Sequence, residues 1–487
     1  MNIILFIIIG FIISLLFPPY FFLPLGFILF PFLCYFIDNN KKILSNINLF
    51  NLSFCLGFSF FFSFLFWLQN PFYVFDEMRN FSFLFILLVI LLSLIFSFVF
   101  LIILKFNKTI PTFLKVPLIF LITEFVISNL FYGFPWLTFS SIISGNEYFS
   151  FILKHFGSLV SSYIILQTFC LPYLFLVSNK KKFEIRLLFF FVIIPLAIII
   201  FFHNNYYWKI TSEKKNIEVE IFQLNNKINY EDDGYENILQ DIVNNIKLSD
   251  SDLVIFGENN YPYLIDTFDL EKIQNILKSN QIVVIGGTRL ENGNYFNTLL
   301  NISQNNISKF DKKILVPFGE FLPFRKFLSL FENISGQNDY TMGKKDRIIK
   351  IKNQISYIPI ICYEIIFYWK LINSLNFESD FIINITNDIW FGNFLGPYQH
   401  FYLTKLRAAE FNKPIFRVSN NGISAIIDNN GKVLINTQLN KKRSFKYDFI
   451  IEKNHNFYKT HFFNNIYFLF FIIILNIIYL YRKNDQK

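Results

Sequence analysis

Three residues in the second half of the chain have side chains that could together carry out acyl transfer. Cys362 ends an apolar run that begins at Ile358, Glu258 follows a short apolar run, and Lys312 lies between them in the sequence. A thiol attacks an acyl carbon only as the thiolate, so it needs a base or a nearby cation. A carboxylate could take the thiol proton, and a lysine could stabilise the thiolate and then the tetrahedral oxyanion. These residue types meet the requirements without histidine or metal.

Each of the three side chains, taken alone, also has a purely structural explanation. A free cysteine in an apolar strand is most often a small buried hydrophobic residue. Glu258 could be a solvated residue of a turn, and Lys312 or its neighbour Lys313 a solvated loop charge. Only the three residues taken jointly favour a catalytic site.

The cysteine and histidine content argues against a disulfide framework and a metal site. Cys362 is the only cysteine between residues 203 and 462, and the others lie in membrane-like stretches: Cys34, Cys55 and Cys170. Four scattered cysteines give no disulfide pattern. The sequence has no CxxC and no HExxH motif, and its 5 histidines are dispersed. We therefore expect no metal and no other cofactor.

The segment 203–462 has the pattern of an α/β domain. Strands are expected at 217–222, 252–256, 282–287, 414–419 and 423–427, with two further buried strands ending at Cys362 and Thr386. Helices are expected at 235–246 and near 268–279, and Asn430-Gly431 predicts a hairpin turn. Buried strands that alternate with helices indicate sheets covered on both faces. In such domains chemistry collects where strands end, which is where Glu258 and Cys362 lie.

The rest of the chain is typical of a membrane protein. Apolar residues make up 53% of the sequence and charged residues 16%. Eight apolar runs are long enough to cross roughly 30 Å of hydrocarbon: about 2–16, 19–37, 49–68, 81–104, 112–131, 157–178, 185–202 and 463–481. We therefore expect a seven-span domain at 1–202, an α/β domain at 203–462, and a last span with its tail at 463–487.

Basic residues predict the orientation of these spans. They gather in the loops after spans two, four and six and in the C-terminal tail, whereas the odd-numbered short loops hold only Arg79 and Lys154. By the positive-inside rule both termini lie in the cytoplasm and the segment 203–462 lies outside. The net charge of +9 largely reflects this bias, so we expect no nucleic-acid partner.

The sequence around the three candidate residues resembles the nitrilase (carbon-nitrogen hydrolase) superfamily and, more specifically, the apolipoprotein N-acyltransferase family. The matching runs are Leu315–Glu320, Ile361–Glu364, Asn387–Gly392, Gly396–His400, Arg407–Glu410, Pro414, Asn420–Ile423 and Phe134–Leu137. The resemblance covers nearly the whole chain and implies an αββα sandwich. In the site it implies a base at Glu258, an oxyanion-stabilising lysine at Lys312 and a nucleophile at Cys362.

Further site residues follow from the same resemblance. Supporting roles, holding Lys312 or lining and ordering the pocket, would belong to Glu320, Glu364, Tyr363 and Asn297. The chain departs from the family at one point, because Phe256-Gly257 stands where the family usually has Trp-Pro. We expect Gly257 to loosen the turn that aims Glu258.

The resemblance also implies a reaction in two halves. Cys362 would take the sn-1 acyl chain of a phospholipid as a thioester and pass it to the α-amino group of a diacylglyceryl-modified N-terminal cysteine of a lipoprotein. The enzyme would lie in a bacterial inner membrane with its catalytic domain on the periplasmic side. An apolar stretch near Lys312 could form a membrane-facing lid; its candidates are Phe321, Phe324, Phe327 and Phe331. The same side chains could instead pack in the domain core.

Two rival functions remain open from the sequence. A membrane-tethered amidase would share the three residues but transfer its acyl group to water. A transporter or scaffold would use the outer domain only for binding. Transporters usually carry charges inside the membrane, whereas Glu124 is the main charged residue within these spans. We expect Glu124 to pair with a polar neighbour inside the bundle.

Overall fold

The computed structural model describes residues 2–40, 43–74, 76–105, 111–177, 214–227, 232–265, 267–327, 332, 338–351, 355–374 and 379–452. The chain divides into two compact units. The first comprises Met1–Gln69, Ser82–Ile210 and Tyr458–Lys487, and the second Asn70–Phe81 and Thr211–Phe457, as far as these ranges are described. The second unit thus takes in a short segment, Asn70–Phe81, from within the predicted seven-span domain.

The first unit is helical. Its helices are α1 (Asn2–Ser14), α2 (Leu23–Asn40), α3 (Asn46–Phe64), α4 (Leu84–Lys105), α5 (Thr112–Asn129), α6 (Ser150–Cys170) and α7 (Pro172–Val177), with short 3-10 turns η3 (Phe139–Ile143) and η4 (Glu147–Phe149). The 3-10 turn η1 (Phe66–Tyr73) begins in this unit and ends in the segment assigned to the second. Five helical segments are long and apolar enough to cross a membrane, and α1 is a shorter apolar helix. The predicted spans 185–202 and 463–481 lie outside the described residues, so the count of eight stays a prediction.

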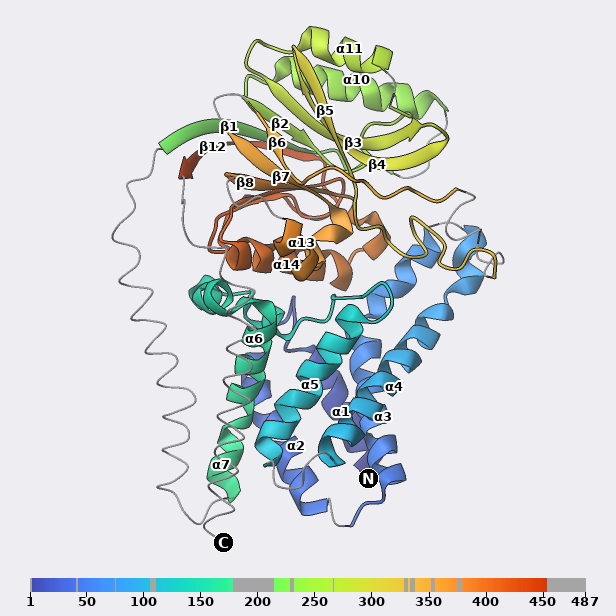
Figure 1. Cartoon of the computed structure of the whole chain (residues 1–487), viewed down its shortest axis with the longest axis vertical. Helices are drawn as coiled ribbons and strands as arrows, with labels where there is room; N and C mark the ends of the chain where they lie inside the picture. Colours follow the sequence, from blue (N-terminus) through green and yellow to red (C-terminus); the bar gives the residue numbers. More distant parts are fainter. Residues whose placement is uncertain are drawn as a thin grey trace. The chain divides into compact units, whose positions relative to one another are not determined.

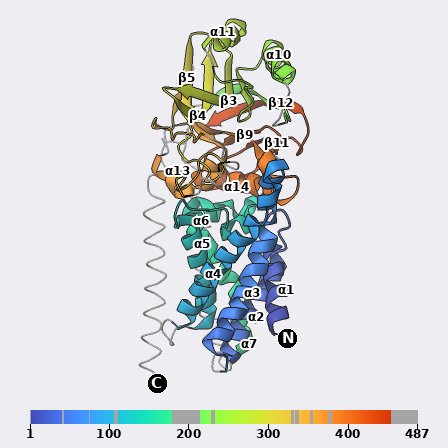
Figure 2. The same ribbon diagram turned by 90° about the vertical axis from the view of Figure 1, so that its right-hand side faces the viewer.

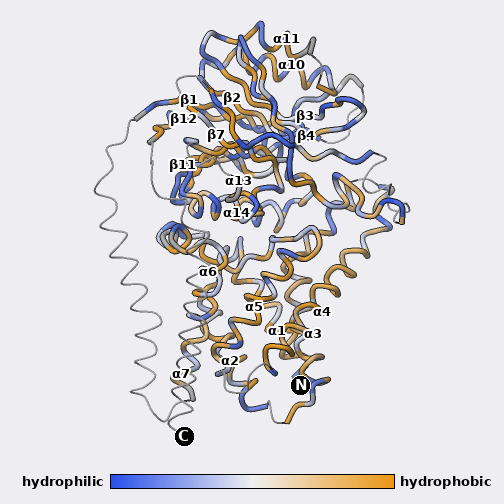
Figure 3. Tube along the Cα trace, viewed as in Figure 1, coloured by the Kyte–Doolittle hydropathy of each residue, from blue (hydrophilic) through white to orange (hydrophobic). Residues whose placement is uncertain are grey.

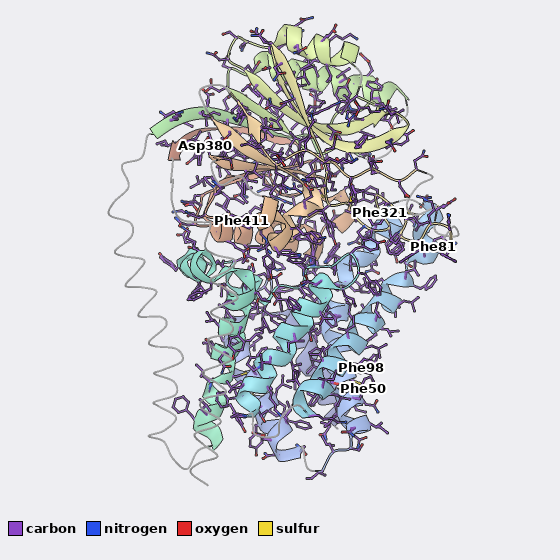
Figure 4. The ribbon with its side chains drawn as sticks, in the orientation of Figure 1. Phe50, Phe81, Phe98, Phe321, Asp380 and Phe411 are labelled. Carbon is purple, nitrogen blue, oxygen red and sulfur yellow. The ribbon has the colours of Figure 1, made fainter. Side chains whose placement is uncertain are left out.

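Aromatic rings fill the spaces between these helices. Phe50 of α3 and Phe98 of α4 have ring centroids 5.4 Å apart (Figure 4), and Phe96 of α4 meets Phe120 of α5 at 5.3 Å. The helices are coloured as hydrophobic along most of their length (Figure 3). Exposed apolar side chains on such helices are what a lipid environment requires.

Glu124 lies inside the helical bundle and is paired there. Its side chain is buried on α5, where it accepts hydrogen bonds from the Phe139 backbone N–H at 2.9 Å and the Ser162 hydroxyl at 3.1 Å. The predicted pairing of this carboxyl with a polar neighbour is therefore present. The hydrogen bonds connect α5 with η3 and α6, so this polar group serves the packing of the bundle.

The second unit contains two six-stranded sheets. The first has the order β12-β1-β2-β3-β4-β5, from Arg443–Glu452, Lys214–Gln223, Leu253–Phe256, Ile282–Glu291, Asn294–Ser303 and Asn306–Asp311. The second has the order β11-β10-β9-β8-β7-β6, from Val433–Asn436, Ala425–Ile427, Ile415–Ser419, Phe381–Thr386, Ser356–Ile361 and Ile349–Lys350.

Helices cover the outer faces of the two sheets. Helices α10 (Asp232–Leu248) and α11 (Thr267–Ile276) lie on the first sheet, and α13 (Tyr368–Ser374) and α14 (Leu395–Phe411) lie on the second (Figures 1 and 2). The sheets face each other, and the Tyr357 hydroxyl of β7 donates a hydrogen bond to Asn301 Oδ1 of β4 at 3.1 Å. This arrangement is the αββα sandwich that the resemblance implies.

Burial on both faces explains why the short apolar runs form central strands. All four residues of β2 are buried, and Val254 and Phe256 belong to the core beneath α10 and α11. Strand β7 contains Pro359, which cannot donate to a ladder. Its neighbour β6 pairs only with Ser356 and Tyr357, so the missing donor removes no β6 hydrogen bond, and the strand can continue to Cys362.

Candidate active site

The predicted base, lysine and thiol meet at strand ends in the second unit. Glu258 follows β2, Lys312 follows β5 and Cys362 follows β7. Lys312 Nζ lies 3.4 Å from Glu258 Oε1, and the Cys362 thiol hydrogen-bonds the Glu258 carboxyl. All three side chains are buried. One cluster thus brings together residues from both sheets. Its two outermost members in the chain, Glu258 and Cys362, are about a hundred positions apart.

Four neighbouring groups, together with burial, set the position and the proton affinity of Glu258. The Asn297 amide donates to Oε1 at 2.8 Å, and the Asn387 backbone N–H donates to Oε2 at 2.8 Å. Burial raises the pKa of Glu258, the charge of Lys312 lowers it, and the carboxylate of Glu320 raises it, with a net upward shift. A raised pKa makes a carboxylate a stronger proton acceptor, which suits a general base.

Lys312 is held as a permanent cation. Its ammonium lies 2.9 Å from Glu320 Oε1. Asn297 donates to the same oxygen at 2.8 Å, and the Val316 backbone N–H donates to Glu320 Oε2 at 2.8 Å. Burial alone would lower the pKa of Lys312, but the carboxylates of Glu320 and Glu258 raise it above its ordinary value. The site therefore keeps a positive charge beside the thiol at any working pH.

Cys362 stands at a sharp change of backbone direction. Its φ of 49° lies in the left-handed region, which is uncommon for residues other than glycine, and the 3-10 turn η8 (Cys362–Ile366) starts there. Such backbone strain collects at functional sites. Burial and then the Glu258 charge raise the pKa of the Cys362 thiol, although Lys312 lowers it. The resting thiol is therefore neutral, so its attack on a substrate would require a nearby base to accept the proton.

Glu364 is fully buried and binds Arg347 and the backbone. Arg347 donates to its two oxygens at 2.8 and 2.5 Å. The backbone N–H groups of Lys313 and Ile314 donate to Oε1 at 2.8 and 3.0 Å, and that of Ile361 donates to Oε2 at 2.9 Å. Burial raises the pKa of Glu364, but Arg347, the Ile361 backbone N–H and the charge of Lys312 together lower it below its ordinary value. Glu364 thus ties the loop after Lys312 to the strand before Cys362. Of the two predicted supporting acids, Glu320 is the one that forms an ion pair with Lys312.

A second charged cluster, formed by Asp388, His400 and Arg417, interacts with the Cys362 thiol through the charge of Asp388. It was not predicted from the sequence. Asp388 accepts hydrogen bonds from Thr386 at 3.1 Å and Arg417 at 2.6 Å, and its Oδ1 lies 2.8 Å from His400 Nδ1. Burial raises the pKa of Asp388, but Arg417 and His400 lower it to about 2. Thr386 also hydrogen-bonds the Cys362 thiol. The sequence signal was Arg417, a charged residue in the middle of the buried strand β9.

The remaining predicted residues differ in burial. Tyr363 is buried, and its ring lies edge-on to Phe367 at 5.1 Å. Phe321, labelled in Figure 4, is half-buried, whereas Phe324 is 66% and Phe327 86% exposed. Phe331 lies outside the described residues. Phe324 and Phe327 therefore do not pack in the domain core.

No group of three or more His, Cys, Asp or Glu side chains is arranged to hold a metal ion among the residues that the structure describes. A neutral thiol, a carboxylate of raised proton affinity and a buried ammonium can form and resolve a covalent acyl intermediate.

Two facing sheets covered by helices, with these side chains at the strand ends, define a carbon-nitrogen hydrolase-like domain. Residues 219–444 match the family described as "Carbon-nitrogen hydrolase", and residues 9–171 match the "Apolipoprotein N-acyltransferase N-terminal domain". The apolipoprotein N-acyltransferase of Wigglesworthia glossinidia brevipalpis is 30% identical over 503 aligned positions, which cover 96% of this chain and 95% of that protein. The chain belongs to the apolipoprotein N-acyltransferase family.

Other relatives match a smaller part of the chain. The protein of the same name from Brucella melitensis biotype 1 is 36% identical over 198 residues, or 37% of this chain and 36% of the relative. That match therefore spans little more than a third of the Brucella protein. A solved carbon-nitrogen hydrolase superfamily protein from Xanthomonas campestris is 16% identical, with a TM-score of 0.38, over 49% of this chain and 91% of that structure.

Proposed function

We propose that this chain transfers a fatty acyl chain from the sn-1 position of a phospholipid to the α-amino group of the diacylglyceryl-modified N-terminal cysteine of a lipoprotein. This reaction is the final step of lipoprotein maturation. The observation that carries the proposal is the buried cluster of Glu258, Lys312 and Cys362 at strand ends. The cluster occurs in a chain whose helices include five that are apolar and long enough to cross a membrane.

The first half-reaction forms a thioester. The Cys362 sulfur attacks the carbonyl carbon of the sn-1 ester, and its proton passes to the Glu258 carboxylate. The developing oxyanion is stabilised by the ammonium of Lys312, whose charge is held by Glu320. The C–O bond then breaks, the leaving alkoxide takes the proton from Glu258, and a lysophospholipid is released.

The second half-reaction resolves the thioester. The α-amino group of the acceptor attacks the same acyl carbon, and Glu258 accepts a proton from the amine. Collapse of the tetrahedral intermediate forms the amide and expels the Cys362 sulfur, which regains its proton. Asn297 bridges Glu258 and Glu320 with one amide nitrogen, so it holds the base in place through both halves.

Water must be kept from the thioester, and lipid must reach it. The exposed rings of Phe324 and Phe327 lie in the segment that follows Lys312 and Glu320 in the chain. The segment is anchored at its base, because the Leu322 backbone N–H donates to Asp339 at 2.9 Å. We assign these rings to a lid that contacts the membrane, on the periplasmic side of a bacterial inner membrane as the positive-inside rule predicts.

Intact-mass measurement tests the proposal. The purified full chain is incubated with phospholipid vesicles alone, and an acyl adduct is expected on the wild type but not on Cys362→Ala. Cys55→Ala is the matched control, because it removes a cysteine of the helical unit and should keep the adduct. The absence of an adduct on a wild type that binds the vesicles would refute the enzymatic proposal. Addition of a diacylated lipopeptide then separates transfer from hydrolysis, the reaction of the rival amidase.

A further inference from the structure

The turn that carries Glu258 is closed by a side chain. The Gly257 backbone N–H donates to Asn260 Oδ1 at 2.7 Å, and the Gly257 carbonyl accepts from the Gly286 N–H at 3.1 Å. Asn259, which lies between Gly257 and Asn260 in the chain, has a left-handed φ of 51°. Asparagine tolerates this conformation better than most residues. Gly257 is thus hydrogen-bonded on both sides, and the loosened turn expected from the sequence is not what the structure shows.

Asn260 also connects this turn to the other sheet. Its Nδ2 donates to Asn420 Oδ1 at 3.0 Å. Asn420 follows β9 and donates in turn to Asn387 Oδ1 at 3.3 Å, and Asn387 follows β8. The Asn387 backbone N–H donates to the Glu258 carboxylate at 2.8 Å. We call Asn260, Asn420 and Asn387 the asparagine relay; it begins beside Glu258 in the chain and ends on its carboxylate.

The relay crosses the boundary between the two sheets, where the base and the nucleophile must be aligned. Glu258 belongs to the first sheet and Cys362 to the second. Apolar packing between sheets is not directional, whereas hydrogen bonds fix distance and angle. A Cβ on Gly257 would lie 2.9 Å from both Asn260 Oδ1 and the Asn420 backbone nitrogen. The glycine therefore permits the close approach on which the relay depends.

We propose that Asn260 is a positioning residue that, through Asn420 and Asn387, aims Glu258 at the Cys362 thiol. The inference rests on the proposed role of Glu258 as the base. Asn260 is 1% exposed and Asn420 2% exposed, so their hydrogen bonds are shielded from competing water. Loss of Asn260 leaves the Gly257 N–H without its acceptor and the turn without its link to the second sheet.

The test measures the rate at which iodoacetamide alkylates Cys362 in the full chain, as a function of pH. In the wild type the rate is expected to rise with pH as Glu258 ionises, and Glu258→Gln should abolish this rise. Asn260→Ala should lower the alkylation rate at neutral pH by about tenfold, which is less than the ~100-fold or more that loss of a general base costs. It should also make the increase of the rate with pH less steep. Asn301→Ala is the matched control, because Asn301 is a buried asparagine that links the two sheets at Tyr357; it should cost stability and leave the pH profile unchanged.

A double-mutant cycle separates positioning from general destabilisation. If Asn260 and Asn420 act in one chain, Asn260→Ala/Asn420→Ala should be no slower than the slower single variant. Asn260→Ala combined with Asn301→Ala should instead react at the rate of Asn260→Ala alone, because Asn301→Ala leaves the alkylation rate unchanged. A wild-type pH profile in Asn260→Ala, or multiplied losses in the first pair, overturns the inference. If the alkylation rate of the wild type itself does not rise with pH, the proposed role of Glu258 is wrong. This result is distinct from failure of the asparagine relay.

Discussion

Gly286 lies directly against the backbone of Glu258. A Cβ atom at Gly286 would be 2.7 Å from the Glu258 Cα and 2.9 Å from the Asn259 nitrogen. Both are backbone atoms, which cannot rotate away as a side chain can. The neighbouring strand β3 therefore has to present a glycine where the turn after β2 passes over it.

Replacement of Gly286 by alanine should displace Glu258, the proposed base. Because a shift of about 1 Å at a reacting group can cost on the order of 100-fold in rate, we expect Gly286→Ala to slow thioester formation by roughly that factor. Gly287→Ala is the control, since its Cβ would meet only side-chain atoms of Tyr261 and Ile265. The acylation rates of both variants are measured in single-turnover reactions with phospholipid. Equal rates in the two variants would contradict the assigned contact.

Removal of the Glu258 charge should separate activity from stability. Glu258→Gln keeps the shape of the side chain but cannot accept a proton, so acylation of Cys362 should fall by about 100- to 10,000-fold. The buried carboxylate has a raised pKa, which means that its ionisation opposes folding at neutral pH. The thermal unfolding midpoint of Glu258→Gln should therefore equal or exceed that of the wild type. A clear fall in the midpoint would show that the carboxylate mainly supports the fold.

The same pKa shift predicts a pH dependence. Since the ionised form of Glu258 is the proposed base, the acylation rate should rise through a pKa above that of an ordinary glutamate. The folded pKa exceeds the unfolded one, so the contribution of Glu258 to stability is complete below the unfolded pKa and is lost as pH rises through the folded pKa. Lys312, with its raised pKa, should add no falling limb below pH 10. Rapid-quench acylation rates across pH measure the profile.

The Glu364–Arg347 pair should matter for folding. Arg347 is 2% exposed and Glu364 0% exposed, and removal of one partner of a buried pair costs about 3–5 kcal/mol. We expect Glu364→Gln to lower the unfolding midpoint strongly. Asp250→Asn, which breaks the exposed pair of Asp250 with Lys278, should change it little. Differential scanning calorimetry in detergent compares them, and similar midpoints would refute the structural role of Glu364.

The exposed rings of the proposed lid give a separate prediction. A phenylalanine that enters an apolar phase contributes about 1.5–3 kcal/mol, so Phe324→Ser and Phe327→Ser should each slow phospholipid-dependent acylation by roughly tenfold. The unfolding midpoint and iodoacetamide alkylation should not change. Leu248→Ser removes another exposed apolar side chain, at the end of α10, and should leave acylation intact. Unchanged lipid turnover in both Phe variants would remove the lid.

The sequence predicted those features that depend on local pattern. Continuous apolar runs such as Leu253–Phe256 and Phe381–Thr386 are strands because both faces of each sheet are covered. The strand-end positions of Glu258 and Cys362 follow from the same runs. Strands β4 and β5 were not predicted, because their polar residues interrupt the apolar pattern, although Asn297 on β4 was expected to line the site.

The hydrogen-bond partners across the two sheets could not be predicted from local pattern. Arg347 reaches Glu364, and Arg417 reaches Asp388, only after the strands are placed. Nothing in the residues flanking Glu258 indicates that Asn260 would find Asn420, 160 positions away. Such pairs depend on sheet order and register, which a single sequence does not specify. This is why Gly257 was expected to loosen a turn that is in fact held.

The pairing of β1 with β12 determines when the catalytic domain can finish folding. Strand β12 pairs with β1 along its whole length, from Lys214 opposite Glu452 to Gln223 opposite Arg443. Until the chain has been synthesised past Glu452, β1 is an unprotected sheet edge with apolar Ile217, Val219 and Ile221. Exposed edges of this kind invite aggregation. Chains truncated before Arg443 should therefore be substrates for proteases and chaperones rather than partly active enzymes.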